Sequence, residues 1–245
     1  MSDQASTIMV NTLEPQSGTT LTVGKSGQNL VVNADSLKAN VAKDAGANAL
    51  FTSDGSGTLS GLNSGFGSAQ TLISTQTASS SASISFTSGI DSTYKEYIFE
   101  FINMHPATNS VNFGFQVNAS GQSGFNETIT SSAFAAQHAE NDTDSALTYQ
   151  GGSDQGQGTA LQVLNYNTGN QNDASVSGEL HLFNPASTTY VKNFYSVSNE
   201  MLEAAYSVEM FIGGYINTTA IIDEVEFKFA SGNVDAGTIK MYGIK

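Results

Sequence analysis

The chain has 245 residues, a formal net charge of −14 and only 12% charged side chains, about half the share found in ordinary soluble domains. Eight Lys and Arg residues are too few for the clustered cationic surface that binds nucleic acid, and they also disfavour anionic membranes. The sequence has no Cys, which excludes disulfides, thiolate metal sites and cysteine nucleophiles, and no apolar stretch long enough for a membrane helix.

The first 69 residues are predicted to form an extended arm and linker. Residues 19–33, TTLTVGKSGQNLVVN, are typical of a hairpin with a glycine-bracketed turn, and residues 35–46 carry a weak helix signal. Residues 52–68 are rich in Gly and Ser, with apolar residues spaced as anchors. Because such a segment buries too little to offset its ordering entropy, we expect it to dock on a partner subunit.

From residue 70 to residue 245 the alternation of apolar and polar residues predicts strand after strand. Phe113 and Phe115, and likewise Phe227 and Phe229, alternate with polar residues or glycine, so each of these strands is expected to have one wet face. Turn formers separate the strands, which predicts an antiparallel β-sandwich or jelly roll. Strands are expected at 71–77, 82–87, 94–104, 111–117, 127–136, 146–150, 161–166, 176–183, 189–197, 207–216, 224–229 and 238–244.

The segment YKEYIFEFINM, residues 94–104, is apolar on both faces of the predicted strand. One face carries Tyr97, Phe99 and Phe101, and the other carries Ile98, Ile102 and Met104. Two apolar faces favour a central strand, or one that packs against a neighbouring subunit.

The densest acidic stretch is HAENDTDS, residues 138–145, in which Glu140, Asp142 and Asp144 alternate with other residues as calcium ligands sometimes do. No Gly or terminal Glu falls at the offsets of an EF-hand loop. A solvated loop is therefore favoured over a calcium site, and we predict no metal and no cofactor.

The three histidines, His105, His138 and His181, are the candidates for a general base. The chain contains no G-x-S-x-G nucleophile elbow, and a lone histidine is more often an ordinary surface or core residue. A carboxylate pair for glycoside cleavage depends on geometry that a sequence does not reveal. We therefore predict no catalytic residues and a chain that is not an enzyme.

Two further patterns concern ligand binding. The glycines of QGGSDQGQG, residues 150–158, have no strand-to-helix context and no following Lys, which argues against a phosphate site. Tyr149, Tyr166 and Tyr195 are candidates for stacking on sugars, and packing in the core or at an interface is the alternative for each.

Three stretches together carry a resemblance to a known family: ISFTSGIDSTYKEYIFEFINMHP (84–106), LHLFNPASTTYVKNFYS (180–196) and GGYINTTAIIDEVEFKFASGNVDAGTIKMYGIK (213–245). From about residue 66 to the end, the chain resembles a family of virion structural proteins of marine tailed bacteriophages. The closing SGNVDAGTIKMYGIK is the most specific part. In it, Gly232 and Gly237 are expected to frame a turn before a last strand with Ile239 facing inward.

The resemblance implies a non-enzymatic virion component, assembled in the host cytoplasm and released by lysis. The first 15 residues agree, because they contain no basic start and no long apolar run of a secretory signal. We expect a tail appendage (fibre or tip) that is a homotrimer by analogy with other appendages. Its N-terminal arm would bind other virion proteins, and its distal loops a host-surface glycan or outer-membrane protein. The alternatives are a capsid decoration (cement) protein, and a carbohydrate-binding module or depolymerase.

Overall fold

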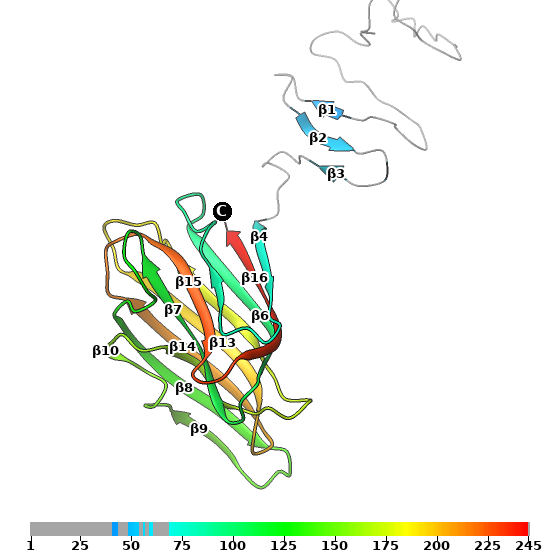
Figure 1. The fold of residues 1–245 in the computed structure, drawn as a ribbon, viewed down its shortest axis with the longest axis vertical. Helices are drawn as coiled ribbons and strands as arrows, with labels where there is room; N and C mark the ends of the chain where they lie inside the picture. Colours follow the sequence, from blue (N-terminus) through cyan, green and yellow to red (C-terminus); the bar gives the residue numbers. More distant parts are fainter. Residues whose placement is uncertain (1–40, 44–48, 54–55, 57–58, 61–68, 245) are drawn as a thin grey trace, which may run out of the picture. The chain divides into compact units, whose positions relative to one another are not determined.

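Strands make up every regular element in the part of the chain that the structure describes, as the sequence predicts. The structure is a computed structural model that describes residues 41–43, 49–53, 56, 59–60 and 69–244. It divides into two units, residues 1–64 and 65–245 (Figure 1). Over the described residues there is no helix long and apolar enough to cross a membrane. The hairpin predicted for residues 19–33 lies outside them.

The first unit contains a small antiparallel sheet in the order β1-β2-β3. Its strands are β1 (Val41–Lys43), β2 (Ala49–Ser53) and β3 (Leu59–Ser60). The helix expected over 35–46 is wrong at β1, where Val41 pairs with Thr52 of β2. A β-branched residue with a cross-strand partner outweighs a weak i, i+4 signal. The segment read as a linker likewise contributes the end of β2 and all of β3.

The second unit is an antiparallel β-sandwich in which one continuous 13-stranded sheet is folded into two layers, here called the large sheet and the small sheet (Figure 1). The large sheet runs β4-β16-β6-β12-β13-β14-β8, and β9 and β10 pair with successive parts of β8. The small sheet runs β11-β7-β15-β5. A single register pair, Thr168 with Leu202, joins β11 of the small sheet to β13 of the large sheet.

The bounds of the sandwich strands are β4 (Gln70–Thr77), β5 (Ile84–Phe86), β6 (Glu96–Pro106), β7 (Val111–Ala119), β8 (Ile129–Ala139), β9 (Ser145–Tyr149), β10 (Gly156–Gly158), β11 (Gln162–Thr168), β12 (Val176–Phe183), β13 (Lys192–Leu202), β14 (Tyr206–Ile216), β15 (Ile222–Phe229) and β16 (Val234–Ile244). Each strand predicted from period-two alternation is confirmed, and β12 coincides with its predicted range. Among the sandwich strands only β10 is not predicted, because GQG has no apolar residue to reveal a period.

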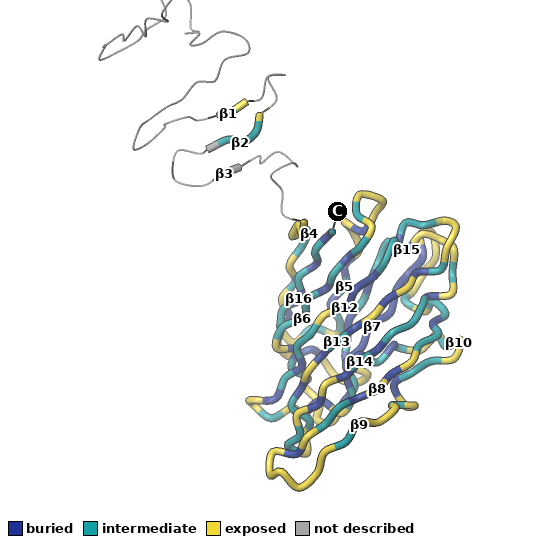
Figure 2. The backbone as a smooth tube through the Cα atoms, turned by 180° about the vertical axis from the view of Figure 1, so that it is seen from behind, coloured by how far each residue is buried: buried dark blue, intermediate teal, exposed yellow. Residues whose placement is uncertain are grey.

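The core between the two sheets is built around phenylalanine rings. Phe227 of β15 lies at its centre, with ring centroids 5.4 Å from Phe99, 6.2 Å from Phe113 and 6.3 Å from both Phe86 and Phe115. All of these side chains are buried. Figure 2 shows buried residues alternating with more exposed ones along the strands, and exposed residues gathered in the loops. This alternation leaves the outer face of the large sheet to solvent.

The prediction that Met104 shares a face with Ile98 and Ile102 is wrong. Asn103 adopts a positive φ of 50°, and the register of β6 against β12 shifts between Val176 and Gly178. This β-bulge turns Met104 into the core, where it is fully buried. Asn tolerates the left-handed conformation better than most residues, which accounts for its place at the bulge.

The expected wet face of β7 is covered for most of its length. Gln116 is buried, and its Nε2 donates to the carbonyl oxygens of Glu127 (2.9 Å), Ala160 (3.0 Å) and Thr159 (3.2 Å). The segments that lead into β8 and β11 therefore close over this strand, and the glutamine satisfies their backbone. The polar side of β7 therefore anchors two loops through Gln116.

The closing strand follows the prediction in its inward face, because Ile239 and Met241 are fully buried. Gly232 has φ 72° in the turn before β16. Gly237, with φ 127°, lies within β16 at a register shift against β6 and does not frame the turn. A Cβ there would lie 2.9 Å from the Asn103 carbonyl oxygen, so the bulged pairing requires glycine.

Candidate binding face on the large sheet

The face of the large sheet that points away from the small sheet is here called the outer face. Four of the aromatic side chains on this face, from four successive strands, are here called the aromatic row: Tyr195 from β13, Phe211 from β14, Phe134 from β8 and Tyr149 from β9. Phe211 pairs with Phe134, and Phe134 pairs with Tyr149, so these three lie side by side on adjacent strands. Tyr195 lies two residues along β13 from the partner of Phe211.

The aromatic row remains largely in contact with solvent. Tyr149 is 63% exposed, Phe134 45% and Tyr195 40%. The rings of Phe134 and Phe211 are stacked, with centroids 4.9 Å apart and planes 9° from parallel. Contiguous aromatic surface of this kind on a soluble domain marks an interaction site more often than scattered single side chains do.

Two adjoining hollows follow the outer face. The first, about 280 Å³, is lined by Phe134, Tyr195, Phe211 and Gly213, among others. The second, about 370 Å³, is lined by the carboxylates of Glu100, Glu179 and Glu209. Val197 lines both hollows, so the aromatic part and the acidic part adjoin on the outer face.

His181 of β12 supports one end of the aromatic row. It is buried although it is on the outer face, and its ring stacks on Tyr195 with centroids 4.3 Å apart. Its Nδ1 makes a 2.5 Å hydrogen bond with Glu96 Oε1, and its Nε2 lies 3.2 Å from Glu179 Oε1 without hydrogen-bond geometry. The arrangement holds the imidazole rigidly between two carboxylates, as a base for the tyrosine ring.

The three tyrosines singled out from the sequence have different roles. Tyr195 and Tyr149 belong to the outer face, and Tyr149 Oη donates a 2.5 Å hydrogen bond to Asp154 Oδ2, which raises the pKa of the phenol. Tyr166 instead packs half-buried against the core, and burial raises its pKa. The sequence missed Phe134 and Phe211. They could be found in the sequence because each occupies a position that alternation assigns to the solvent side of its strand. Phe211, for example, stands between buried Met210 and Ile212.

The acidic loop does not assemble a cation site. Asp142 Oδ1 lies 3.2 Å from His138 Nε2, whereas Asp144 Oδ2 accepts a 3.4 Å hydrogen bond from Tyr206. Over residues 41–244, apart from the short gaps in their description, no three His, Asp or Glu side chains are grouped to hold a metal ion. The carboxylates of Asp142 and Asp144 therefore face separate partners.

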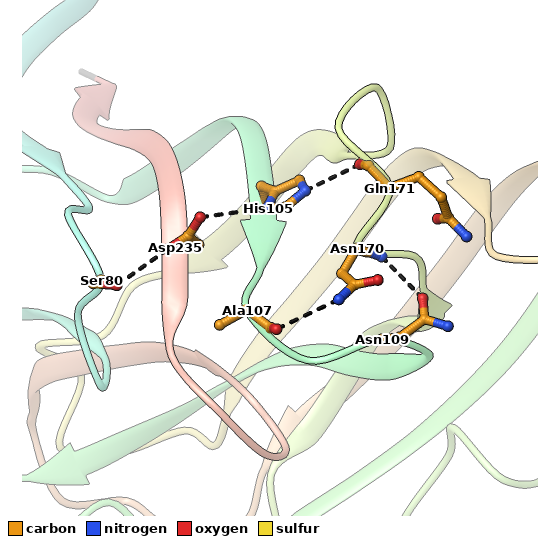
Figure 3. Close-up of polar contacts among 7 residues, drawn as sticks. All are labelled: Ser80, His105, Ala107, Asn109, Asn170, Gln171 and Asp235. Atoms are coloured by element: carbon orange, nitrogen blue, oxygen red, sulfur yellow. Dashed lines mark hydrogen bonds and ion pairs between the residues drawn. The ribbon is translucent and has the colours of Figure 1, made fainter.

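His105 belongs to a polar network that ties loops together at one end of the sandwich (Figure 3). Ser80 Oγ donates to Asp235 Oδ1 at 3.1 Å, Asp235 Oδ2 lies 4.0 Å from His105 Nδ1, and His105 Nε2 lies 3.1 Å from the Gln171 carbonyl oxygen. In a catalytic triad the histidine stands between the nucleophile and the acid. Here the aspartate stands between them, so His105 cannot take the serine proton.

The glycine-rich stretch 150–158 ends in β10 and is held in place by hydrogen bonds to the buried side chain of Gln162. Its Nε2 donates to the Ser153 carbonyl oxygen at 2.8 Å, and its Oε1 accepts from Ser131 Oγ at 2.7 Å. No helix follows this stretch in the described chain, so it lacks the N-terminus that would bind a phosphate.

Two buried charged residues of β13 were not found from the sequence. Burial raises the pKa of Glu200 to about 8, although Thr168 Oγ1 donates a 2.7 Å hydrogen bond to it. Burial lowers the pKa of Lys192, whose Nζ donates to the carbonyl oxygens of Tyr190 and Thr218. Eight residues of strand separate the two, about 26 Å, so they do not form an acid–base pair.

Comparison of the chain with protein-family models, with curated proteins and with solved structures finds no match. The functional assignment therefore depends on the chemistry of the outer face.

Proposed function

We propose that this chain is a non-enzymatic structural protein of a bacteriophage virion, a tail appendage (fibre or tip) that contacts the host surface. The observation that carries the proposal is the exposed aromatic row on a rigid antiparallel sandwich, which is suited to binding by surface complementarity. The candidate histidines and the buried acid and base lie in separate packing networks. The resemblance of residues 84–106, 180–196 and 213–245 to virion proteins supplies the biological setting.

In this proposal residues 1–69 attach the sandwich to other virion proteins. The strands β1, β2 and β3 have three, five and two residues. Sheets this small are marginally stable alone, and contacts with a partner subunit would supply the missing burial. A homotrimer is proposed, because appendages commonly assemble with cyclic symmetry.

The low charge content suits a particle in seawater. Contacts that depend on exposed charges weaken as salt shortens the Debye length, whereas aromatic and hydrogen-bonded contacts persist. With 12% charged residues, the chain depends mainly on the second kind.

Immunogold labelling of intact particles with an antibody against residues 70–245 tests the proposal. Gold at the tail supports the appendage, whereas gold over the head indicates the alternative of a capsid decoration protein. Absence of gold from particles whose lysate contains the protein contradicts both. Light scattering of the full chain tests the trimer, and a monodisperse monomer at micromolar concentration counts against it.

The carbohydrate-binding module remains a second candidate because of the aromatic row. A depolymerase is distinguished from it by turnover. Glu100 and Glu179 are direct partners across β6 and β12 and line one hollow, so they are the acids to replace. Reducing-sugar release from host polysaccharide that is lost in Glu179→Gln would establish an enzyme.

A further inference from the structure

We propose that the outer face binds a neutral polysaccharide chain, laid across β13, β14, β8 and β9 over the aromatic row. The inference rests on the proposed function for its biological setting, since a host-surface glycan is the ligand that an appendage would meet. Binding itself is a property of the isolated chain and can be measured without the particle.

The aromatic row offers a continuous apolar surface on which a sugar ring can pack. Phe211, Phe134 and Tyr149 lie on adjacent strands, so a ring is presented at about every 4.8 Å. Phe134 and Phe211 stack on each other and present their edges, whereas His181 covers only one face of Tyr195, so a pyranose ring would stack by its C–H face on the other, over Gly213. Tyr195 extends the surface on the next strand and is fixed from behind by His181, so little freedom is lost on binding.

The adjoining acidic hollow offers hydrogen-bond partners for hydroxyl groups. Glu100, Glu179, Glu209 and Asn199 line the hollow that adjoins the aromatic part. Ionised carboxylates only accept hydrogen bonds, and sugar hydroxyls are abundant donors. Gly213 between Tyr195 and Ser132 leaves the floor of the aromatic part open to a ring, because it has no side chain.

The charge of the face selects a neutral ligand. Three carboxylates in one hollow repel an anionic polysaccharide, and Lys240 Nζ, 3.9 Å from Glu100 Oε2, offsets one of them. The same acids argue against a second copy of this chain as the occupant. A two-fold contact centred near the acidic hollow would bring the carboxylates of both copies together, in a protein whose net charge is already −14.

The test uses the full chain in native gels that contain laminarin, galactomannan, mannan or dextran, followed by calorimetry with the polysaccharide that retards it most. Alginate serves as the anionic probe. Retardation by at least one neutral polysaccharide and none by alginate is expected. No retardation by any of the four neutral polysaccharides overturns the inference, as does retardation by alginate alone.

Variants locate the site. Tyr195→Ala and Phe134→Ala are expected to weaken binding about tenfold each, the loss of one aromatic contact, whereas Tyr195→Phe keeps it. Tyr190→Ala is the matched control, because Tyr190 is 70% exposed and lies in the loop before β13, outside the aromatic row. Thermal melting of each variant verifies its fold. Equal affinity in Tyr190→Ala and Tyr195→Ala would overturn the assignment to this face.

Two further outcomes separate this inference from the proposed function. A chain that labels the tail but binds no neutral polysaccharide overturns the glycan site and leaves the appendage standing. A chain that binds such a polysaccharide but is absent from particles overturns the appendage and leaves the glycan site standing. A concentration-dependent dimer that Phe134→Ala dissociates would assign the face to a second copy and overturn the inference.

Discussion

The phenol ring of Tyr195 lies on the imidazole of His181, with centroids 4.3 Å apart and planes 12° from parallel. Glu96 holds that imidazole from the neighbouring strand β6, through a 2.5 Å hydrogen bond. An exposed ring is thus supported by a buried one that cannot rotate freely. A side chain fixed in this way loses less entropy when it meets a ligand than an unsupported tyrosine would.

His181→Ala should therefore weaken the protein in two ways. We expect a loss of about 1–3 kcal/mol in the free energy of unfolding, because Glu96 loses its partner and Tyr195 its packing surface. Urea titration followed by circular dichroism measures the loss. His138→Ala is the control, since His138 is exposed and should change stability by less than about 0.5 kcal/mol. Equal effects of the two substitutions would contradict the supporting role of His181.

The raised pKa of Glu200 predicts that the free energy of unfolding falls as the pH rises. Burial raises the pKa of Glu200 from 4.5 to about 8 in the folded chain. Between these values the folded state keeps a proton that the unfolded state releases, so the contribution is full below pH 4.5 and is lost towards pH 8. Relative to Glu200→Gln, wild-type stability should drop by on the order of 4 kcal/mol over this range.

Denaturant titrations of wild type and Glu200→Gln at pH 5 and pH 8.5 give that difference directly. The comparison with Gln cancels the titration of the other carboxylates. If the two proteins show the same pH dependence, Glu200 does not retain its proton in the fold.

Gly114 and Gly213 both lie within strands, but we expect substitution by alanine to destabilise the fold at Gly114 and not at Gly213. A Cβ at Gly114 would lie 2.4 Å from the Gln162 carbonyl oxygen, whereas a Cβ at Gly213 would have its nearest neighbour 4.0 Å away. Gly114→Ala should lower the free energy of unfolding by about 1–3 kcal/mol, because the added Cβ pushes β7 away from β11. Gly213→Ala should keep the fold and narrow the aromatic hollow. A stable Gly114→Ala protein would contradict this account of the β7–β11 pairing.

Replacing a phenylalanine of the core should cost much more stability than replacing one of the outer face. Phe227→Ala removes a ring that touches four others in the core, and should cost about 3–5 kcal/mol. Phe134→Ala removes a ring that is 45% exposed and should cost less than about 1 kcal/mol. Melting temperatures of the two variants provide the measurement. A larger loss from Phe134→Ala would place that ring in the stability core and not on a binding face.

The sequence predicted the strands well because period-two alternation is a local property. Val225, Phe227 and Phe229 are buried as expected, and strand ends moved by only a few residues. Errors arose where the backbone departs from regular pairing. The bulge at Asn103 reverses Met104, and nothing in the alternation of YKEYIFEFINM marks it.

The binding face was harder to predict because it depends on register between strands far apart in the sequence. Tyr149 and Tyr195 were candidates as exposed tyrosines, but their relation to Phe134 and Phe211 follows only from the pairing of β13, β14, β8 and β9. The same holds for Gln116, whose burial depends on two loops that close over it. Local patterns specify faces, and only topology brings the faces of different strands together.

The position of β16 between β4 and β6 also has a kinetic consequence. Ile244 pairs with Gln70 and Ile239 with Phe101, so β16 completes a sheet with strands that lie far before it in the chain. Until then, β4 and β6 have backbone edges without their native partner, and these edges invite pairing with other chains. Pairings so distant in sequence are slow to form. We therefore expect the pairing of β16 to be a late step in folding, and chains in which it has not yet formed to depend on chaperones.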